Sequence, residues 1–150
     1  AFFPKFPGVM AGDTAVLQRL ALTRRQAVLP ALAISYFDIF EDPKAEPQTF
    51  ELKNDASAKL KEAAQTFANA RLSILMVEGY TDHHGASGAN QIESYQRALT
   101  VRQYLIDELG FDPNRVIAVG YGEGEPVDDT MAPGYVEANR RIVLKAVPQP

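Results

Sequence analysis

Two oppositely charged side chains, Asp82 and Arg97, stand where they could bind a ligand together. Asp82 follows the apolar run 72–77, and Arg97 lies in a long helical pattern that extends to about Leu109. A strand–loop–helix unit would bring this carboxylate and this guanidinium to the same sheet edge. A carboxylate accepts hydrogen bonds from an ammonium group, and a guanidinium holds a carboxylate through two parallel hydrogen bonds. The pair therefore suits a zwitterionic, amino-acid-like ligand. A structural salt bridge is the alternative, because surface ion pairs are common.

The loop between these two residues has its own signals. Gly85 allows the backbone to turn with a positive φ. Asn90 is placed to cap the following helix, because its side-chain oxygen can accept a hydrogen bond from the first turn. We therefore predict that both residues support the loop and the start of the helix.

This stretch resembles an ordered pattern, Gly-x-Thr-Asp-x-x-Gly…Asn…Ser-x-x-Arg-Ala-x-x-Val, that is typical of the OmpA-like peptidoglycan-binding domain. The matching residues are Gly79, Thr81, Asp82, Gly85, Asn90, Ser94, Arg97, Ala98 and Val101. The end of the chain resembles the ending of the same family, with Tyr121-Gly122-Glu123, Pro126 and Asn139-Arg140-Arg141. The resemblance covers residues 72–147 and is strongest to the peptidoglycan-associated lipoprotein branch.

The resemblance implies a specific ligand, the meso-diaminopimelate of the peptidoglycan stem peptide. By this resemblance Asp82 would hold its ammonium group, Arg97 and loop N–H groups its carboxylate, and Arg140 would add a second positive charge. Thr81, Gly85, Asn90 and Asn139 would support the site, and Arg141 would alternate away from it. The implied setting is the periplasm of a Gram-negative bacterium, where the domain would tether an envelope component to the cell wall.

A second function stays open at this point, in which the same fold is a protein-interaction module of an envelope, motor, secretion or signalling assembly. The family usually enters its first helix soon after the first strand. Here residues 41–49 carry two prolines and three acidic residues, which indicates an inserted loop. Relatives use the backbone at this point to hold the ligand carboxylate. The insertion and the aromatic N-terminal segment could instead contact other envelope proteins.

The remaining pattern predicts an α+β fold in which helices pack on one mixed four-stranded sheet, in the order β-α-β-α-β-β. Expected strands cover 32–40, 72–78, 116–120 and 141–147, and expected helices follow Asp55 and Asn90. The run 72–78 is nearly all apolar, which indicates a central strand. In the last strand Ile142, Leu144 and Ala146 should share one face.

Residues 1–31 form an N-terminal extension, with an irregular segment to Gly12 and a helix from about Asp13 to Val28. The main domain is 32–147.

Composition limits the classes of function. The 150 residues are 46% hydrophobic and 23% charged, which is ordinary for one globular domain. The net charge of −4 argues against a nucleic-acid partner. The chain has no cysteine, and no apolar run reaches the ~18 residues of a membrane span. It starts at Ala1 without a signal peptide, so we expect a processed or trimmed chain.

Other chemistry is weakly supported. His83 and His84 are adjacent, but no third histidine or cysteine exists to complete a metal site. The glycine run 120–125 imitates a dinucleotide-binding loop, yet acidic residues follow it and would repel phosphate. No nucleophile stands beside a base. We therefore expect no metal, no cofactor and no enzymatic activity.

Overall fold

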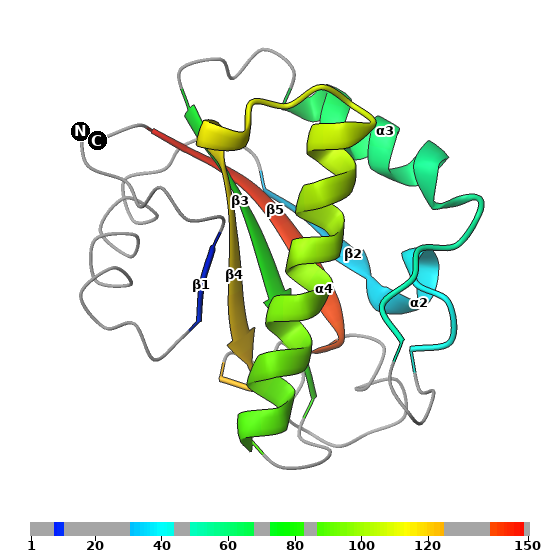
Figure 1. Ribbon diagram of the computed structural model, residues 1–150, viewed down its shortest axis with the longest axis vertical. Helices are drawn as coiled ribbons and strands as arrows, with labels where there is room; N and C mark the ends of the chain where they lie inside the picture. The colour runs from blue at the N-terminus through cyan, green and yellow to red at the C-terminus, as the bar shows by residue number, and fades with distance from the viewer. Residues whose placement is uncertain are drawn as a thin grey trace.

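The computed structural model describes residues 8–10, 31–43, 49–67, 73–82, 87–124 and 139–148. These residues form one mixed sheet in the order β1-β4-β3-β5-β2, with helices on one side (Figure 1). The strands are β1 (Gly8–Met10), β2 (Ala31–Ser35), β3 (Ser73–Tyr80), β4 (Val116–Gly122) and β5 (Arg141–Pro148). The helices are α2 (Tyr36–Ile39), α3 (Ala56–Thr66), α4 (Ser87–Asp107) and the short 3₁₀ helix η1 (Pro113–Arg115).

The central strand is β3, as its continuous apolar run predicts. It pairs in parallel with β4 and antiparallel with β5, and β2 then pairs antiparallel with the other edge of β5. Parallel pairing of β3 and β4 requires a crossover, which α4 supplies. The ends of β3 and β4 and the start of β5 consequently lie at one edge of the sheet, next to the first turns of α4 (Figure 1).

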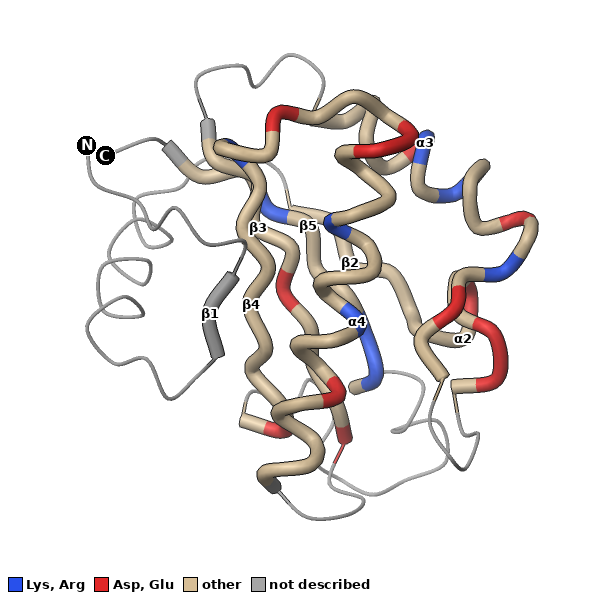
Figure 2. Tube along the Cα trace, in the orientation of Figure 1, with Lys and Arg blue, Asp and Glu red and all other residues tan. Residues whose placement is uncertain are grey.

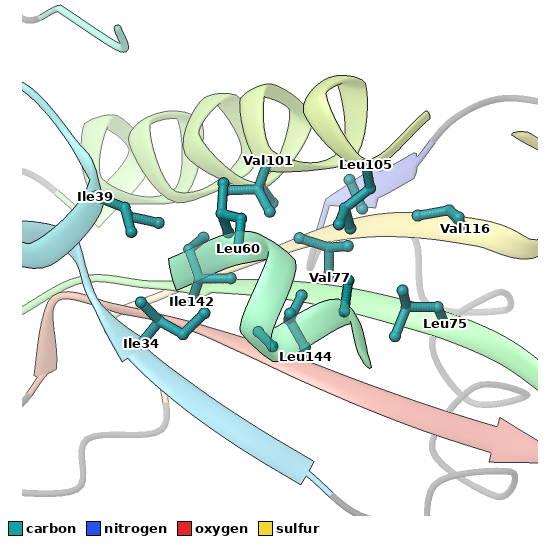
Figure 3. Packing of buried hydrophobic residues seen from close by; sticks show 14 of the residues in the cluster. Ile34, Ile39, Leu60, Leu75, Val77, Val101, Leu105, Val116, Ile142 and Leu144 are labelled. Carbon is teal, nitrogen blue, oxygen red and sulfur yellow. The ribbon is translucent and has the colours of Figure 1, made fainter. Parts of the chain in front are cut away.

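The main hydrophobic core lies between the sheet and the two long helices. Figure 3 shows Leu60 of α3 and Val101 and Leu105 of α4 pointing toward the strand residues Val77 and Leu144. In β5 the residues Ile142, Leu144 and Ala146 all belong to this core, which confirms the predicted alternation.

The opposite face of the sheet carries a second, smaller apolar cluster. Because side chains alternate along a strand, the neighbours of the core residues point to this face. Its buried members are Ile74, Met76, Ile117, Val119 and Val147, and Tyr121 packs against them. The sheet is thus apolar on both sides near its centre, as the run in β3 indicates.

Two glycines let α4 lie very close to the sheet. A Cβ atom added to Gly79 of β3 would be 2.1 Å from the carbonyl oxygen of Ser94. One added to Gly120 of β4 would be 2.7 Å from the backbone nitrogen of Tyr95. Any larger residue would push the helix away. These glycines therefore set the distance between the helix and the end of the sheet.

Two of the predictions about the N-terminal half are wrong in detail. The expected strand 32–40 ends at Ser35, because Ser35 Oγ caps α2 by accepting from the N–H of Phe37 at 3.2 Å. The expected irregular segment up to Gly12 contains β1, whose residues Gly8 to Met10 pair with Ala118 to Gly120 of β4. Aromatic and proline content misled both assignments, since sheet pairing and capping outweigh local preference.

The predicted fold class is otherwise confirmed, with the four expected strands in the sheet and β1 added at its edge. The predicted N-terminal helix lies outside the described residues. The boundary between 31 and 32 stays a prediction, although β1 comes before it and pairs with the same sheet. None of the described helices has the length and apolar character needed to cross a membrane.

Candidate ligand-binding site

Three buried charged residues and one that is partly buried, Arg140, meet at the edge where β3 ends and β5 begins. Figure 2 marks acidic and basic positions of α4, of the end of β3 and of the start of β5 in this region. We call the four residues the α4 charge cluster: Asp82, Glu93, Arg97 and Arg140. Burying charges is unfavourable unless they are paired, so their grouping needs an explanation beyond surface solubility.

Asp82 forms an ion pair with Arg140. Its side chain is fully buried, and its Oδ1 lies 3.4 Å from Nε of Arg140. Arg140 also donates from Nη1 to the carbonyl oxygen of Pro43 at 3.0 Å. The structure therefore places two of the three predicted ligand-binding residues in direct contact and gives Arg97 a different partner.

Arg97 is the largest fully buried side chain of the described residues. Its Nε and Nη2 lie 2.9 Å and 2.8 Å from Oε2 of Glu93, one helical turn earlier. Its Nη2 and Nη1 donate to the carbonyl oxygens of Pro43 and Thr49, both at 3.4 Å. This guanidinium is thus held within the protein by its own helix and by the chain between α2 and α3.

Three aromatic rings enclose the same guanidinium. Its carbon Cζ lies 4.8 Å from the ring centroids of Tyr36 and Phe40, and 5.2 Å from that of Phe50. A cation over an aromatic face is attracted by the ring quadrupole, more strongly where water is excluded. The rings therefore help to offset the cost of burying Arg97.

The chain after β2 takes this position because of several backbone bonds. The N–H of Tyr36 donates to the carbonyl of Arg140 at 2.8 Å, which ties α2 to the start of β5. Phe40 then forms an isolated antiparallel bridge with Leu52. These bonds direct the ends of the 41–49 insertion toward Arg97. The middle of that insertion, residues 44–48, lies outside the described part of the chain.

Two buried hydroxyl groups belong to this region. Oγ1 of Thr81 makes no hydrogen bond to the described residues, and Oη of Tyr36 lies near the backbone of Tyr80 but makes no hydrogen bond of good geometry. Burial, followed by the nearby Glu93 carboxylate, raises the pKa of Tyr36 far above its ordinary value. Tyr36 therefore remains a neutral hydroxyl. Most buried polar groups in proteins have a hydrogen-bond partner. Two buried hydroxyls that make no hydrogen bond of good geometry to the described residues, in a region that also holds four charged side chains, therefore favour a polar ligand here.

The predicted supporting residues are placed as follows. Asn90 does not cap α4, since the helix begins at Ser87; its Nδ2 instead donates to the carbonyl of Asp82 at 3.3 Å. Thr81 donates its N–H to the carbonyl of Gly122 at 2.8 Å. Asn139 is buried, and its carbonyl accepts from Arg141. Gly85, His83 and His84 lie outside the described residues.

Sequence reasoning missed Glu93 and Tyr36. Glu93 stands four residues before Arg97, a spacing that places both side chains on one face of a helix and could have revealed the pair. Tyr36 carries no such signal, because it lies in the run 32–40, whose aromatic and β-branched content predicts a strand. Within the described residues, no group of three or more His, Cys, Asp and Glu could hold a metal ion.

Comparison with known proteins gives consistent results over most of the chain. The OmpA family profile matches residues 46–140. Outer membrane porin F of Pseudomonas aeruginosa is 36% identical over 101 residues, which are 67% of this chain and 29% of the porin. Peptidoglycan-binding protein ArfA of Mycobacterium bovis is 33% identical over 98 residues, which are 65% of this chain and 28% of that protein.

Among solved structures, the peptidoglycan-associated lipoprotein of Burkholderia pseudomallei superposes with a TM-score of 0.60 at 25% identity. The superposition covers 72% of this chain and 87% of the lipoprotein. The chain spans less than a third of the length of the two sequence relatives named above. With the family match over residues 46–140 and the sheet and helix arrangement described above, the chain belongs to the OmpA family.

Proposed function

We propose that this domain binds peptidoglycan without covalent linkage, by gripping the free end of a meso-diaminopimelate side chain in the stem peptide. The α4 charge cluster is the observation that carries this proposal: a buried carboxylate, Asp82, lies 3.4 Å from a guanidinium, Arg140, at one edge of the sheet. Arg97 lies beside them, and it shares with Arg140 the carbonyl of Pro43.

The chemistry of the site fits the chemistry of that ligand. The free end of meso-diaminopimelate carries one ammonium group and one carboxylate on the same carbon atom. Asp82 is suited to accept from the ammonium, and a guanidinium of the cluster is suited to hold the carboxylate. The hydroxyls of Tyr36 and Thr81 add two polar groups that a ligand could satisfy.

The relatives point to the same partner. One is named a peptidoglycan-binding protein, and a structural neighbour is named a peptidoglycan-associated lipoprotein. Another relative is named an outer membrane porin, which supports a location in the cell envelope. We place the domain on the periplasmic side, where it would tether an envelope component to the wall.

Sacculus binding tests this proposal. The domain should bind saturably to purified sacculi whose stem peptides carry meso-diaminopimelate, and much more weakly to sacculi that carry lysine at the same position. Lysine keeps the ammonium group and lacks the carboxylate, so the guanidinium loses its anionic partner.

Asp55→Asn, a change at an exposed aspartate away from the cluster, is the control and should bind like the wild type. Equal binding to both kinds of sacculi would contradict ligand recognition. Absence of binding by a folded domain would favour the protein-interaction function.

A further inference from the structure

The strand β2 forms one edge of the described sheet (Figure 1). It pairs with β5 on one side, and no described strand lies on its other side. Its first three residues, 31–33, are exposed. Leu32 lies on the helix side of the sheet and is still 37% exposed, so the helices do not cover it. An open sheet edge is a template for pairing with another strand, which makes β2 a candidate interaction surface.

The register of β2 shows which backbone groups point away from the sheet. In an antiparallel pair, residues that exchange hydrogen bonds alternate with residues that do not. The N–H of Tyr36 donates to the carbonyl of Arg140 at 2.8 Å, one step beyond the last residue pair of β2 and β5. By this alternation Leu32 also bonds to β5, whereas Ala31 and Ala33 direct their N–H and C=O groups outward.

The usual protections of a sheet edge are missing from β2. Natural edge strands carry charges, prolines or bulges that keep another strand from joining. The sequence of β2, Ala-Leu-Ala-Ile-Ser, holds no charge and no proline, and its register with β5 continues without a shift. Lys145 of β5, which lies opposite Ala31, has its charge offset by Glu78 at 3.9 Å. Nothing in β2 itself therefore opposes pairing.

A second copy of this chain fits this edge by symmetry. Ala31 and Ala33 stand one residue before and one residue after Leu32. If two β2 strands meet antiparallel about a two-fold axis at Leu32, Ala31 of each copy lies opposite Ala33 of the other, and their outward donors and acceptors all find partners. The two exposed Leu32 side chains meet at the axis and leave the water. No like charges are brought together, because the strand is neutral.

We propose that β2 is an interaction surface at which a second copy of this chain adds its own β2, antiparallel and related by a two-fold axis at Leu32. Such an interface is isologous, with the same surface used on both copies. Its short strands bury less area than a stable dimer needs, so the association is weak and reversible. The candidate ligand site lies past the other end of β2, next to Arg140, and stays open. A dimer therefore presents two sites, which raises its avidity for a wall.

A single engineered cysteine tests the axis. The chain has no cysteine of its own. At the axis the two Leu32 residues form a pair without mutual hydrogen bonds, whose Cα atoms lie about 4.5 Å apart, within reach of a disulfide. Under mild oxidation Leu32→Cys should form a covalent dimer at least about tenfold faster than Lys61→Cys, because pairing raises the local thiol concentration. Lys61 is an exposed residue of α3, and equal rates overturn the inference.

A neighbouring cysteine tests the register. In the proposed dimer the two copies of residue 33 are diagonal neighbours about 7–8 Å apart, beyond the reach of a relaxed disulfide. Ala33→Cys should therefore cross-link much more slowly than Leu32→Cys. A faster rate for Ala33→Cys overturns the axis at Leu32 and with it the inference.

The association of the wild type provides a test that needs no disulfide. Sedimentation up to about 1 mM, the range of weak association, should show a reversible monomer–dimer equilibrium. Leu32→Lys sets two like charges opposite each other at the axis and should raise the dissociation constant at least about tenfold. Gln65→Lys adds the same charge at an exposed position of α3 and should associate like the wild type.

Two outcomes of this sedimentation experiment overturn the inference: a wild type that stays monomeric at every concentration, and a Leu32→Lys variant that associates as strongly as the wild type. None of these measurements uses peptidoglycan. Their failure would therefore leave the proposed function untouched, and a failure to bind sacculi would leave the dimer untouched.

Discussion

The two faces of the sheet each carry a cluster of buried charge, and the clusters are built in different ways. The α4 charge cluster draws its members from the end of β3, from α4 and from the residue before β5. On the opposite face is a second group, which we call the strand cluster: Glu78, Tyr80, Tyr121, Arg141 and Lys145. All of its members lie within strands.

Register alone assembles the strand cluster. Tyr80 is paired with Arg141 across β3 and β5, and Arg141 Cζ lies 4.0 Å from the ring centroid of Tyr80. The Tyr80 hydroxyl donates to Glu78 Oε1 at 2.8 Å, and Lys145 Nζ lies 3.9 Å from the same oxygen. Tyr80 stacks on Tyr121 of β4 at 5.1 Å between centroids. Cross-strand neighbours of this kind stabilise a sheet.

The difference between the clusters suggests how each is used. The strand cluster is a ladder of neighbours whose geometry follows from β pairing. The α4 charge cluster depends on loops and backbone carbonyls, it contains a guanidinium with donors to spare, and it lies beside the Tyr36 hydroxyl, which makes no hydrogen bond of good geometry in the described chain. A structural role fits the first cluster, and a ligand-binding role fits the second. Four substitutions test whether the two clusters have these different roles.

The largest effect should come from Arg97→Ala. It leaves the Glu93 carboxylate buried without its cation, and breaking one side of a buried pair costs about 3–5 kcal/mol. Urea unfolding should show this loss in the free energy of unfolding. Lys61→Ala, at an exposed lysine of α3, is the control and should unfold like the wild type. Unchanged stability with abolished sacculus binding would instead make Arg97 a ligand-reading residue.

Asp82→Asn should act on binding. It keeps the shape of the side chain but removes the charge that would hold the ligand ammonium, so affinity for sacculi should fall by about 2–5 kcal/mol. Sedimentation with purified sacculi measures the affinity, and a thermal melt of the same variant measures stability. A melting temperature that drops as far as that of Arg97→Ala, together with normal binding at low temperature, would contradict a ligand-binding role for Asp82.

Glu78→Gln is the matching change in the strand cluster. The amide oxygen can still accept from Tyr80, but the ion pair with Lys145 is lost, so stability should fall by about 1–3 kcal/mol. Sacculus binding should stay at the wild-type level, because the residue lies on the other face of the sheet from α4. A loss of binding in a folded Glu78→Gln variant would mean that the two faces do not have separate roles.

The smallest effect should come from Tyr36→Phe. Its hydroxyl makes no hydrogen bond of good geometry to the described residues, so stability should change little. If the hydroxyl meets the ligand, affinity should fall by about 0.5–1.5 kcal/mol, the usual worth of one neutral hydrogen bond. Sacculus binding measures the affinity and a thermal melt of the same preparation measures the stability. A clear loss of stability would show that the hydroxyl has a structural partner.

Much of the fold could be predicted from local patterns. The continuous apolar run of β3 reflects burial on both faces of that strand, and its residues belong to both apolar clusters. The alternation in β5 reflects burial of Ile142, Leu144 and Ala146 in the main core. Asp55 precedes α3, and Gly110, with φ +76°, follows α4, as their types predict. The errors fall where distant pairing decides, at β1 and at the end of β2.

For the candidate site, too, some features follow from the sequence and others only from the tertiary structure. The residue types of Asp82 and Arg97 and their order in the chain are properties of the sequence, and they predict a zwitterionic ligand, whereas Arg140 is implied only by the family resemblance. Which charge faces which is a property of the tertiary structure. Asp82 meets Arg140, which is remote in sequence, only because β5 runs antiparallel to β3. Arg97 is enclosed only because α2 and the residues that precede α3 bring Pro43 and three aromatic rings against it. Periodicity describes one element at a time, so it cannot reveal contacts made by the packing of several.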